Sequence, residues 1–169
     1  ASSGFLLWGI EDDPGSPLGN GSETSPISVC CKRLISMAIF SKVAAISALA
    51  HKQAMQETRP AMNEYEIAAL IEYVFKKNGC QRVAYPSIVA GGKNATCLHY
   101  NKNSAPLVDG DLLLIDAGGE LDYLSSDITR TFPVGKKFSK AQNSIYNLVL
   151  DAQKQAIAIT KPGVKYSKV

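Results

Sequence analysis

The sequence is poor in the residues that build zinc sites. Its 169 residues include only four cysteines and two histidines, and no pair of cysteines has the CxxC spacing of a zinc finger. A structural zinc site made of cysteine and histidine is therefore not expected. The absence of a cysteine framework favours a reduced, intracellular protein over a disulfide-stapled secreted one.

The sequence also lacks a strong excess of charge and long apolar runs. Lysine and arginine number 18, aspartate and glutamate number 15, and the net charge is +3. Proteins that follow nucleic-acid phosphates concentrate basic residues far more heavily, so nucleic acid is not an expected partner. No apolar stretch appears long enough to span a bilayer, so no membrane partner is expected either.

The order of sequence patterns predicts one α+β unit preceded by an irregular segment. Residues 1–32 contain the loop-like run "EDDPGSPLGNGSETSP" and are predicted to be irregular, apart from a short strand over 5–8. Residues 33–169 form the predicted domain. Helical spacing of apolar residues and capping patterns predict helices over 33–58, 64–77 and 140–160. Alternating or continuous apolar patterns predict strands over 83–89, 96–100, 112–115 and 126–134.

Two helix ends in the sequence resemble each other. "KQAMQETRP" at 52–60 and "KQAIAITKP" at 154–162 both close with threonine, a basic residue and proline. Short helix ends converge by chance, so coincidence is one interpretation. The other is a duplicated architecture in which helices and strands repeat and the third helix opens the second copy.

Two aspartates occupy positions that invite a chemical interpretation. Asp116 ends the apolar run 112–115, and Asp127 lies within the next alternating segment. If these segments pair as a hairpin around residues 120–123, the two carboxylates lie roughly opposite each other, with Cβ atoms about 4.5–5.5 Å apart. Carboxylates that close repel unless a cation lies between them, and two divalent metals are one solution. The alternative is that Asp116 caps a turn and Asp127 pairs with Arg130 or a lysine.

The sequence motifs around these aspartates resemble those of a known family. "AYPSIVAGGKNATCLHYN" and "IDAGGELDYLSSDITRTFPVGKKFSKAQ" resemble the metallopeptidases of pita-bread fold, and within them the Xaa-Pro aminopeptidases and prolidases. The motifs "HYN", "IDAG" and "SDITRTFPV" stand in the family's order between residues 44 and 166. The resemblance implies the first half of a pita-bread domain plus the opening helix of the second half.

The resemblance also implies a site. Asp116 corresponds to the aspartate that chelates one metal, Asp127 to the aspartate that bridges both, and His99 to the histidine that handles protons beside the substrate carbonyl. The resemblance implies two divalent ions, most often Mn²⁺ in this family. They would activate water to cleave the bond before a proline in the second position of a peptide. Thr129 is a weaker candidate for orienting a ligand, and His51 is interpreted as structural.

Several expectations follow from that resemblance alone. The family's remaining ligands, one histidine and two glutamates, would lie beyond Val169, so this chain by itself is expected to be inactive. The full-length protein would be cytoplasmic or mitochondrial and could form a homodimer. Prolidase and methionine aminopeptidase are the rival activities. A metal-free pseudo-enzyme or partner-binding module of the same fold is the alternative of a different class.

Overall fold

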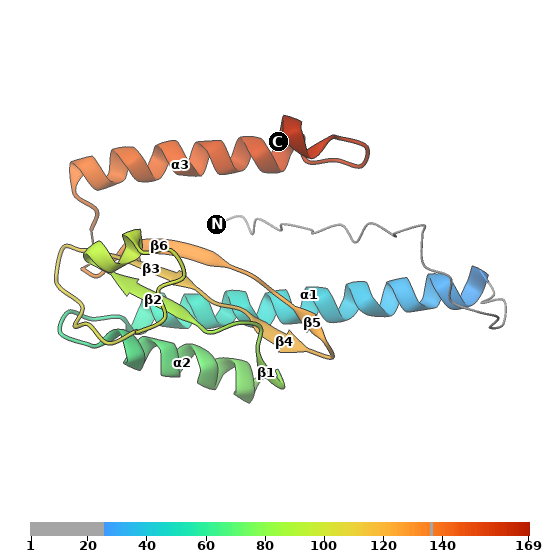
Figure 1. The fold of residues 1–169 in the computed structure, drawn as a ribbon, viewed down its shortest axis with the longest axis horizontal. Coiled ribbons are helices and arrows are strands. Elements are labelled where there is room, and N and C mark those ends of the chain that lie inside the picture. The colour runs from blue at the N-terminus through green and yellow to red at the C-terminus, as the bar shows by residue number, and fades with distance from the viewer. Residues whose placement is uncertain (1–25, 136) are drawn as a thin grey trace.

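The computed structural model describes residues 26–135 and 137–169, with side chains from residue 32 onward. Three helices and six short strands follow one another in the described part of the chain (Figure 1). The helices and strands are α1 (Pro26–Glu57), α2 (Glu64–Lys77), β1 (Arg82–Val83), β2 (Ile88–Gly91), β3 (Leu112–Asp116), β4 (Gly119–Leu121), β5 (Leu124–Ser125), β6 (Thr129–Pro133) and α3 (Lys140–Ile159). Two short 3-10 helices, η1 (Gly92–Thr96) and η2 (Tyr166–Lys168), complete the list.

The strands form two small antiparallel sheets. One has the order β2-β3-β6 and the other the order β1-β4-β5. The burial pattern of β3 alternates, with Leu113 and Ile115 fully buried and their neighbours half-buried. Because successive strand residues face opposite sides, Asp116 lies on the face opposite to Ile115.

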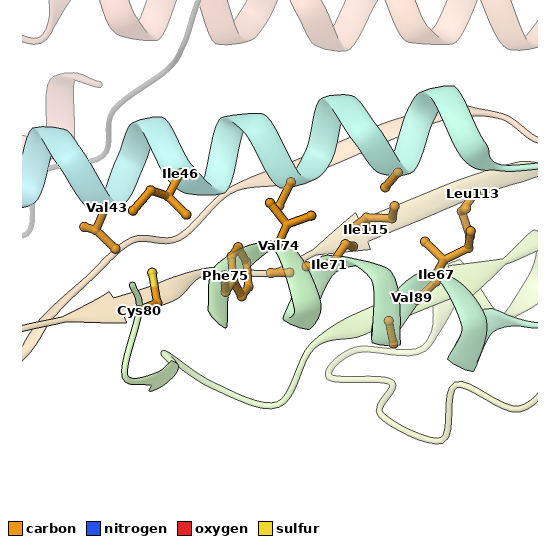
Figure 2. Packing of buried hydrophobic residues seen from close by; sticks show 14 of the residues in the cluster. Val43, Ile46, Ile67, Ile71, Val74, Phe75, Cys80, Val89, Leu113 and Ile115 are labelled. Atoms are coloured by element: carbon orange, nitrogen blue, oxygen red, sulfur yellow. The ribbon is translucent and has the colours of Figure 1, made fainter. Parts of the chain in front are cut away.

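The core lies between the helices α1 and α2 and the sheets. Figure 2 shows Val43 and Ile46 of α1 beside Val74 and Phe75 of α2, all of them buried in one hydrophobic cluster that also includes Ile115. Each such aliphatic or aromatic side chain contributes about 1.5–3 kcal/mol when it leaves water. The α+β fold class expected from the sequence is therefore present, with both helices packed on one side of the strands.

Helix boundaries were predictable where capping chemistry marks them. The Glu66 carboxylate accepts a hydrogen bond from the backbone N–H of Asn63 (2.8 Å), and Ser139 accepts one from the N–H of Gln142 (3.2 Å). Gly79, at φ +95°, follows the end of α2 as expected of a left-handed cap. The predicted start of the first helix at residue 33 was wrong. Helix α1 begins at Pro26, so residues 26–32 are helical and not irregular. The expected strand over 5–8 lies outside the described residues.

The interpretation of residues 96–100 as a strand is wrong. The 3-10 helix η1 ends at Thr96, and the chain then turns, with His99 at φ +54°. Strand residues have negative φ, so this conformation excludes a β segment at His99. The segment is a loop that is fastened to the rest of the domain by side chains, as described below.

Helix α1 contradicts the expectation that no segment is long and apolar enough to span a bilayer. Lys32–Glu57, 26 residues long, meets that criterion by length and composition. A core helix of a globular domain meets the same criterion, and the apolar side of α1 is buried at Val43, Ile46, Ala50 and Ala54. Packing against α2 and the sheets accounts for these buried positions, whereas Leu34, Ile35 and Met37 remain exposed.

Helix α3 has no buried residue, although it carries a comparable apolar stripe. Its Ile145 and Leu148 are 63% and 67% exposed, and both lie 102 positions after the buried pair Val43 and Ile46 of α1. Figure 1 shows α3 on the side of the strands opposite to α1 and α2. The suggested duplication stays a prediction, because the described residues contain a single unit of helices followed by strands.

Candidate metal centre

Asp116 is placed by the central strand of its sheet. It is the last residue of β3, where it pairs with Ile88 of β2 on one side and Thr129 of β6 on the other. Hydrogen bonds to strands on both sides fix the backbone at this position more firmly than at a sheet edge. The half-buried Asp116 carboxylate is therefore attached to a rigid stretch of backbone.

The segments that carry Asp116 and Asp127 pair as an antiparallel hairpin, as expected, but the register differs by two residues, so Asp127 does not lie directly opposite Asp116. The strand pair β4–β5 continues the register of β3–β6 and ends in a tight turn between Leu121 and Leu124. Strand β6 then begins at Thr129, so the partner of Asp116 is two residues beyond Asp127. Asp127 is exposed and precedes the strand instead of standing in its middle.

The two carboxylates nevertheless converge on one side chain that the sequence reasoning missed. The hydroxyl of Tyr85 donates to Oδ1 of Asp116 at 2.6 Å and to Oδ1 of Asp127 at 3.0 Å. Burial raises the pKa of Tyr85, and the hydrogen bonds and charges of the two aspartates raise it further. The phenol is therefore a proton donor at any physiological pH. In the sequence, Tyr85 could have been noticed only because it lies in "AYPS", the start of one of the stretches that resemble the family.

One hydroxyl proton cannot fully satisfy two carboxylates. Only one strong hydrogen bond can form at a time, so the second carboxylate faces the first without full compensation. Within residues 26–135 and 137–169, the one ion pair is between Arg82 and Glu120 (2.6 Å), on the neighbouring sheet. The alternative in which Asp127 pairs with Arg130 is therefore wrong. Arg130 donates instead to the carbonyl of Thr129.

The donor set suits a divalent cation but does not complete its coordination. Carboxylate oxygens are the ligands that hard divalent metals prefer, and such ions take six or more donors. In the described part of the chain, no group of three histidine, cysteine, aspartate or glutamate side chains lies together. Asp116 and Asp127 thus fit as two ligands of a site that needs donors from elsewhere.

His99 lies on the loop that follows η1. It is exposed and, among the described residues, makes no hydrogen bond or ion pair with either aspartate. Its backbone has the left-handed conformation (φ +54°), which histidine adopts more often than most residues other than glycine. The structure therefore presents the side chain to solvent and does not bring it into the aspartate pair.

The loop around His99 is fastened by a buried carboxylate, Glu64. Its Oε1 accepts from the N–H of Gly91 (2.8 Å) and the side chain of Asn94 (3.0 Å). Its Oε2 accepts from the hydroxyl of Tyr100 (2.7 Å) and the N–H of Ala105 (2.9 Å). Burial would raise the pKa of Glu64, but these four donors outweigh it and lower the pKa.

Asn103 adds a second attachment for this loop. Its side chain accepts from the N–H of Val89 (2.9 Å) and donates to the carbonyl of Ser87 (2.7 Å), as a neighbouring strand would. The segment that carries His99 is thus bound to α2 through Glu64 and to β2 through Asn103. Sequence patterns gave no signal for either role.

His51 is buried beneath the site, as its structural interpretation predicted. Its Nδ1 lies 2.9 Å from the carbonyl of Ser47, and its Nε2 is buried without a partner. Burial lowers the pKa of His51 below 6.5, and Arg130 lowers it further, whereas the carbonyls of Ser47, Ile128 and Ile115 oppose the shift. The neutral ring is therefore favoured in the folded protein.

We expect His51 to make stability depend on pH near neutrality. Because its pKa is lower in the folded state, the unfolded chain binds the proton more readily. Its contribution is fully present above pH 6.5 and decreases as the pH falls from 6.5 towards the lowered folded value. Urea unfolding of wild type and His51→Gln at pH 7.5, 6.5 and 5.5 measures this slope. Equal slopes for the two proteins would contradict it.

Comparison with known proteins places this arrangement in a family. The sequence model of metallopeptidase family M24 matches residues 38–169. The chain belongs to metallopeptidase family M24. Xaa-Pro aminopeptidase of Haemophilus influenzae is 52% identical over 125 residues, which are 74% of this chain and 29% of that protein. Xaa-Pro aminopeptidase of Escherichia coli is 40% identical over 133 residues, 79% of this chain and 30% of that protein.

Solved structures agree with the family. The chain matches Pseudomonas aeruginosa aminopeptidase PepP with a TM-score of 0.69 at 50% identity, over 69% of this chain and 26% of that one. It matches proline aminopeptidase P II of Yersinia pestis with a TM-score of 0.75 at 44% identity, over 76% and 29%. The fold is therefore the pita-bread fold of these M24 members. The chain spans less than a third of the length of these relatives.

Proposed function

We propose that this chain supplies part of the catalytic site of a divalent-metal Xaa-Pro aminopeptidase. The observation that carries the proposal is the convergence of Asp116 and Asp127 on the single hydroxyl of Tyr85. Two carboxylates that share one proton donor, with no ion pair to either of them among the described residues, leave excess negative charge that a bound cation would neutralise.

The spacing of the candidate residues supports the same proposal. Among the solved structures of Escherichia coli aminopeptidase P are alanine variants of two aspartates eleven positions apart. Another is the alanine variant of a histidine seventeen positions before the first of these aspartates. Asp116 and Asp127 have the first spacing here, and His99 precedes Asp116 by the second.

Each residue then has a role in the proposed site. Asp116 and Asp127 bind the metal pair, for which Mn²⁺ suits the oxygen donors. Held there, such ions would supply a water of lowered pKa and polarise the substrate carbonyl. His99, exposed on its fastened loop, donates to or accepts a proton from the substrate amide. Tyr85 holds the two carboxylates in place, and the substrate is a peptide with proline in its second position.

Metal binding by the chain itself tests the aspartate assignment. We expect weak Mn²⁺ binding by isothermal titration, because two carboxylates are an incomplete ligand set, and at least a tenfold loss in Asp116→Asn and in Asp127→Asn. Asp151→Asn, on the exposed helix α3, is the matched control and should bind as the wild type does. Equal binding by all four proteins would contradict the assignment.

Hydrolysis tests the substrate assignment. The natural polypeptide that carries this chain is incubated with a peptide that has proline second and with the same peptide that has alanine second, with Mn²⁺ or with chelator. We expect release of the first residue only from the proline peptide and only with metal. Metal-independent binding of a peptide without cleavage would favour the partner-binding alternative.

A further inference from the structure

Ser47 of α1 is a buried hydroxyl on the core-facing side of the helix, one turn before the buried His51. It is 0% exposed, and its Oγ lies 2.7 Å from the Oγ of Ser126 and accepts from the N–H of Gly119 at 3.1 Å. Ser126 in turn donates to the carbonyl of Gly119 from its N–H (3.0 Å) and its hydroxyl (3.3 Å). These bonds form a closed polar cluster at the base of the β4–β5 hairpin.

Gly119, the first residue of β4, and Ser126 lie between the two aspartates in the chain. Gly119 follows Asp116 by three residues, and Ser126 directly precedes Asp127. The chain segments also touch here, because a Cβ added at Gly118 would lie 1.7 Å from the carbonyl oxygen of Ser126. Whatever fixes Gly119 against Ser126 therefore also sets the distance between the segments that bear the carboxylates.

We propose that Ser47 is a positioning residue that fixes the separation of the Asp116 and Asp127 carboxylates through its hydrogen bonds to Gly119 and Ser126. A buried hydroxyl is costly unless its bonds are well formed, so the cluster has one strongly preferred geometry. Helix α1 is itself anchored in the core at Val43, Ile46 and Ala50. It provides the fixed base against which the loop is held.

The functional consequence of this inference rests on the proposed metal site, but its geometric content can be measured without metal. The 13Cζ resonance of a tyrosine reports the hydrogen bonding of its hydroxyl. Protein labelled with 13Cζ-tyrosine gives a Tyr85 signal that is assigned by its loss in Tyr85→Phe. If Ser47 sets the aspartate separation, Ser47→Ala moves this signal towards the position of exposed tyrosines such as Tyr166.

Thr58→Ala is the matched control. Thr58 is also a buried hydroxyl at α1, and it donates to the carbonyl of Ala54 without contacting the loop. We expect this variant to lose stability but to keep the wild-type Tyr85 signal. In the same proteins, Ser47→Ala should weaken Mn²⁺ binding about tenfold, because loss of the residues that orient ligands typically costs this much. Thr58→Ala should leave it unchanged.

The outcomes separate this inference from the proposed function. A Tyr85 signal that moves in Ser47→Ala but not in Thr58→Ala supports the positioning role, even if the wild type binds no Mn²⁺ and the metal proposal fails. An unmoved signal in folded Ser47→Ala overturns the positioning role, even if the wild type binds Mn²⁺. If Ser47→Ala does not fold, Ser126→Ala is measured in the same way, and an unmoved signal there overturns it.

Discussion

Replacing Gly118 with alanine is expected to destabilise the domain by about 3 kcal/mol or more, a cost at the upper end for overpacking. The added Cβ would lie 1.7 Å from the carbonyl oxygen of Ser126 and 2.6 Å from its carbonyl carbon. Backbone atoms cannot rotate away as a flexible side chain can, so one of the two segments must move. Urea unfolding monitored by circular dichroism measures the loss.

Gly79→Ala is the control for this prediction. Gly79 has φ +95°, but a Cβ there meets nothing within 4 Å. The substitution should therefore cost only the strain of a left-handed residue, about 1–2 kcal/mol. Equal losses for the two variants would mean that the close approach at Gly118 is not real. Because that approach brings Asp127 near Asp116, Gly118→Ala should also abolish Mn²⁺ binding by the chain.

Glu64→Gln is the second substitution with a large expected effect, about 3 kcal/mol of lost stability. Four donors, from Gly91, Asn94, Tyr100 and Ala105, point at the two oxygens of this fully buried side chain. A glutamine has one oxygen, and its amide nitrogen would face two of these donors. The charge-assisted bonds are lost and a buried clash of donors replaces them.

Glu66→Gln is the control for Glu64→Gln. Glu66 is exposed and accepts from the N–H of Asn63, a bond that glutamine can also accept, so only a small loss is expected. Thermal unfolding measures both variants, and amide hydrogen exchange over residues 92–105 measures the local effect. Faster exchange of that loop in Glu64→Gln is expected, and wild-type exchange there would contradict the role of Glu64 in holding the segment of His99.

The pH dependence of the wild type gives an independent check on Glu64. Its pKa is lowered in the folded state, so its contribution to stability is present above the unfolded value of 4.5 and decreases as the pH falls through the folded value. The window lies below that of His51, whose contribution is already decreasing below pH 6.5. The two groups can therefore be separated in one titration of stability.

The helices and the central strand were predictable because local chemistry specifies them. The apolar spacing of 67, 71 and 74 defines the buried face of α2, and capping residues mark where α2 and α3 begin. The apolar run at 112–115 forms β3, in which Leu113 and Ile115 are fully buried and the other residues of the strand are half-buried. By contrast, the segment 96–100 has strand-like composition but forms a loop in which Tyr100 donates to the distant Glu64.

The candidate site was predictable only in part. The family resemblance identified Asp116, Asp127 and His99, whereas alternation along the strands gave the wrong register for the two aspartates. The hairpin between them was expected around residues 120–123, but its turn lies between Leu121 and Leu124, and a period of two does not specify this position. Its pairing with β1 depends on residues almost forty positions earlier, which no local pattern records.

By itself, then, the sequence determined the helices, the core-facing positions, the order of the motifs and membership of the family, because each is written in local spacing or in residue identity. Only the tertiary structure decided that Tyr85 joins the two carboxylates, that Glu64 fastens the loop of His99 and that Ser47 lies beneath the loop between Asp116 and Asp127. The physical reason is that these are contacts between polar groups 31 to 72 residues apart. Their partners are chosen by the packing of α1 and α2 against the sheets.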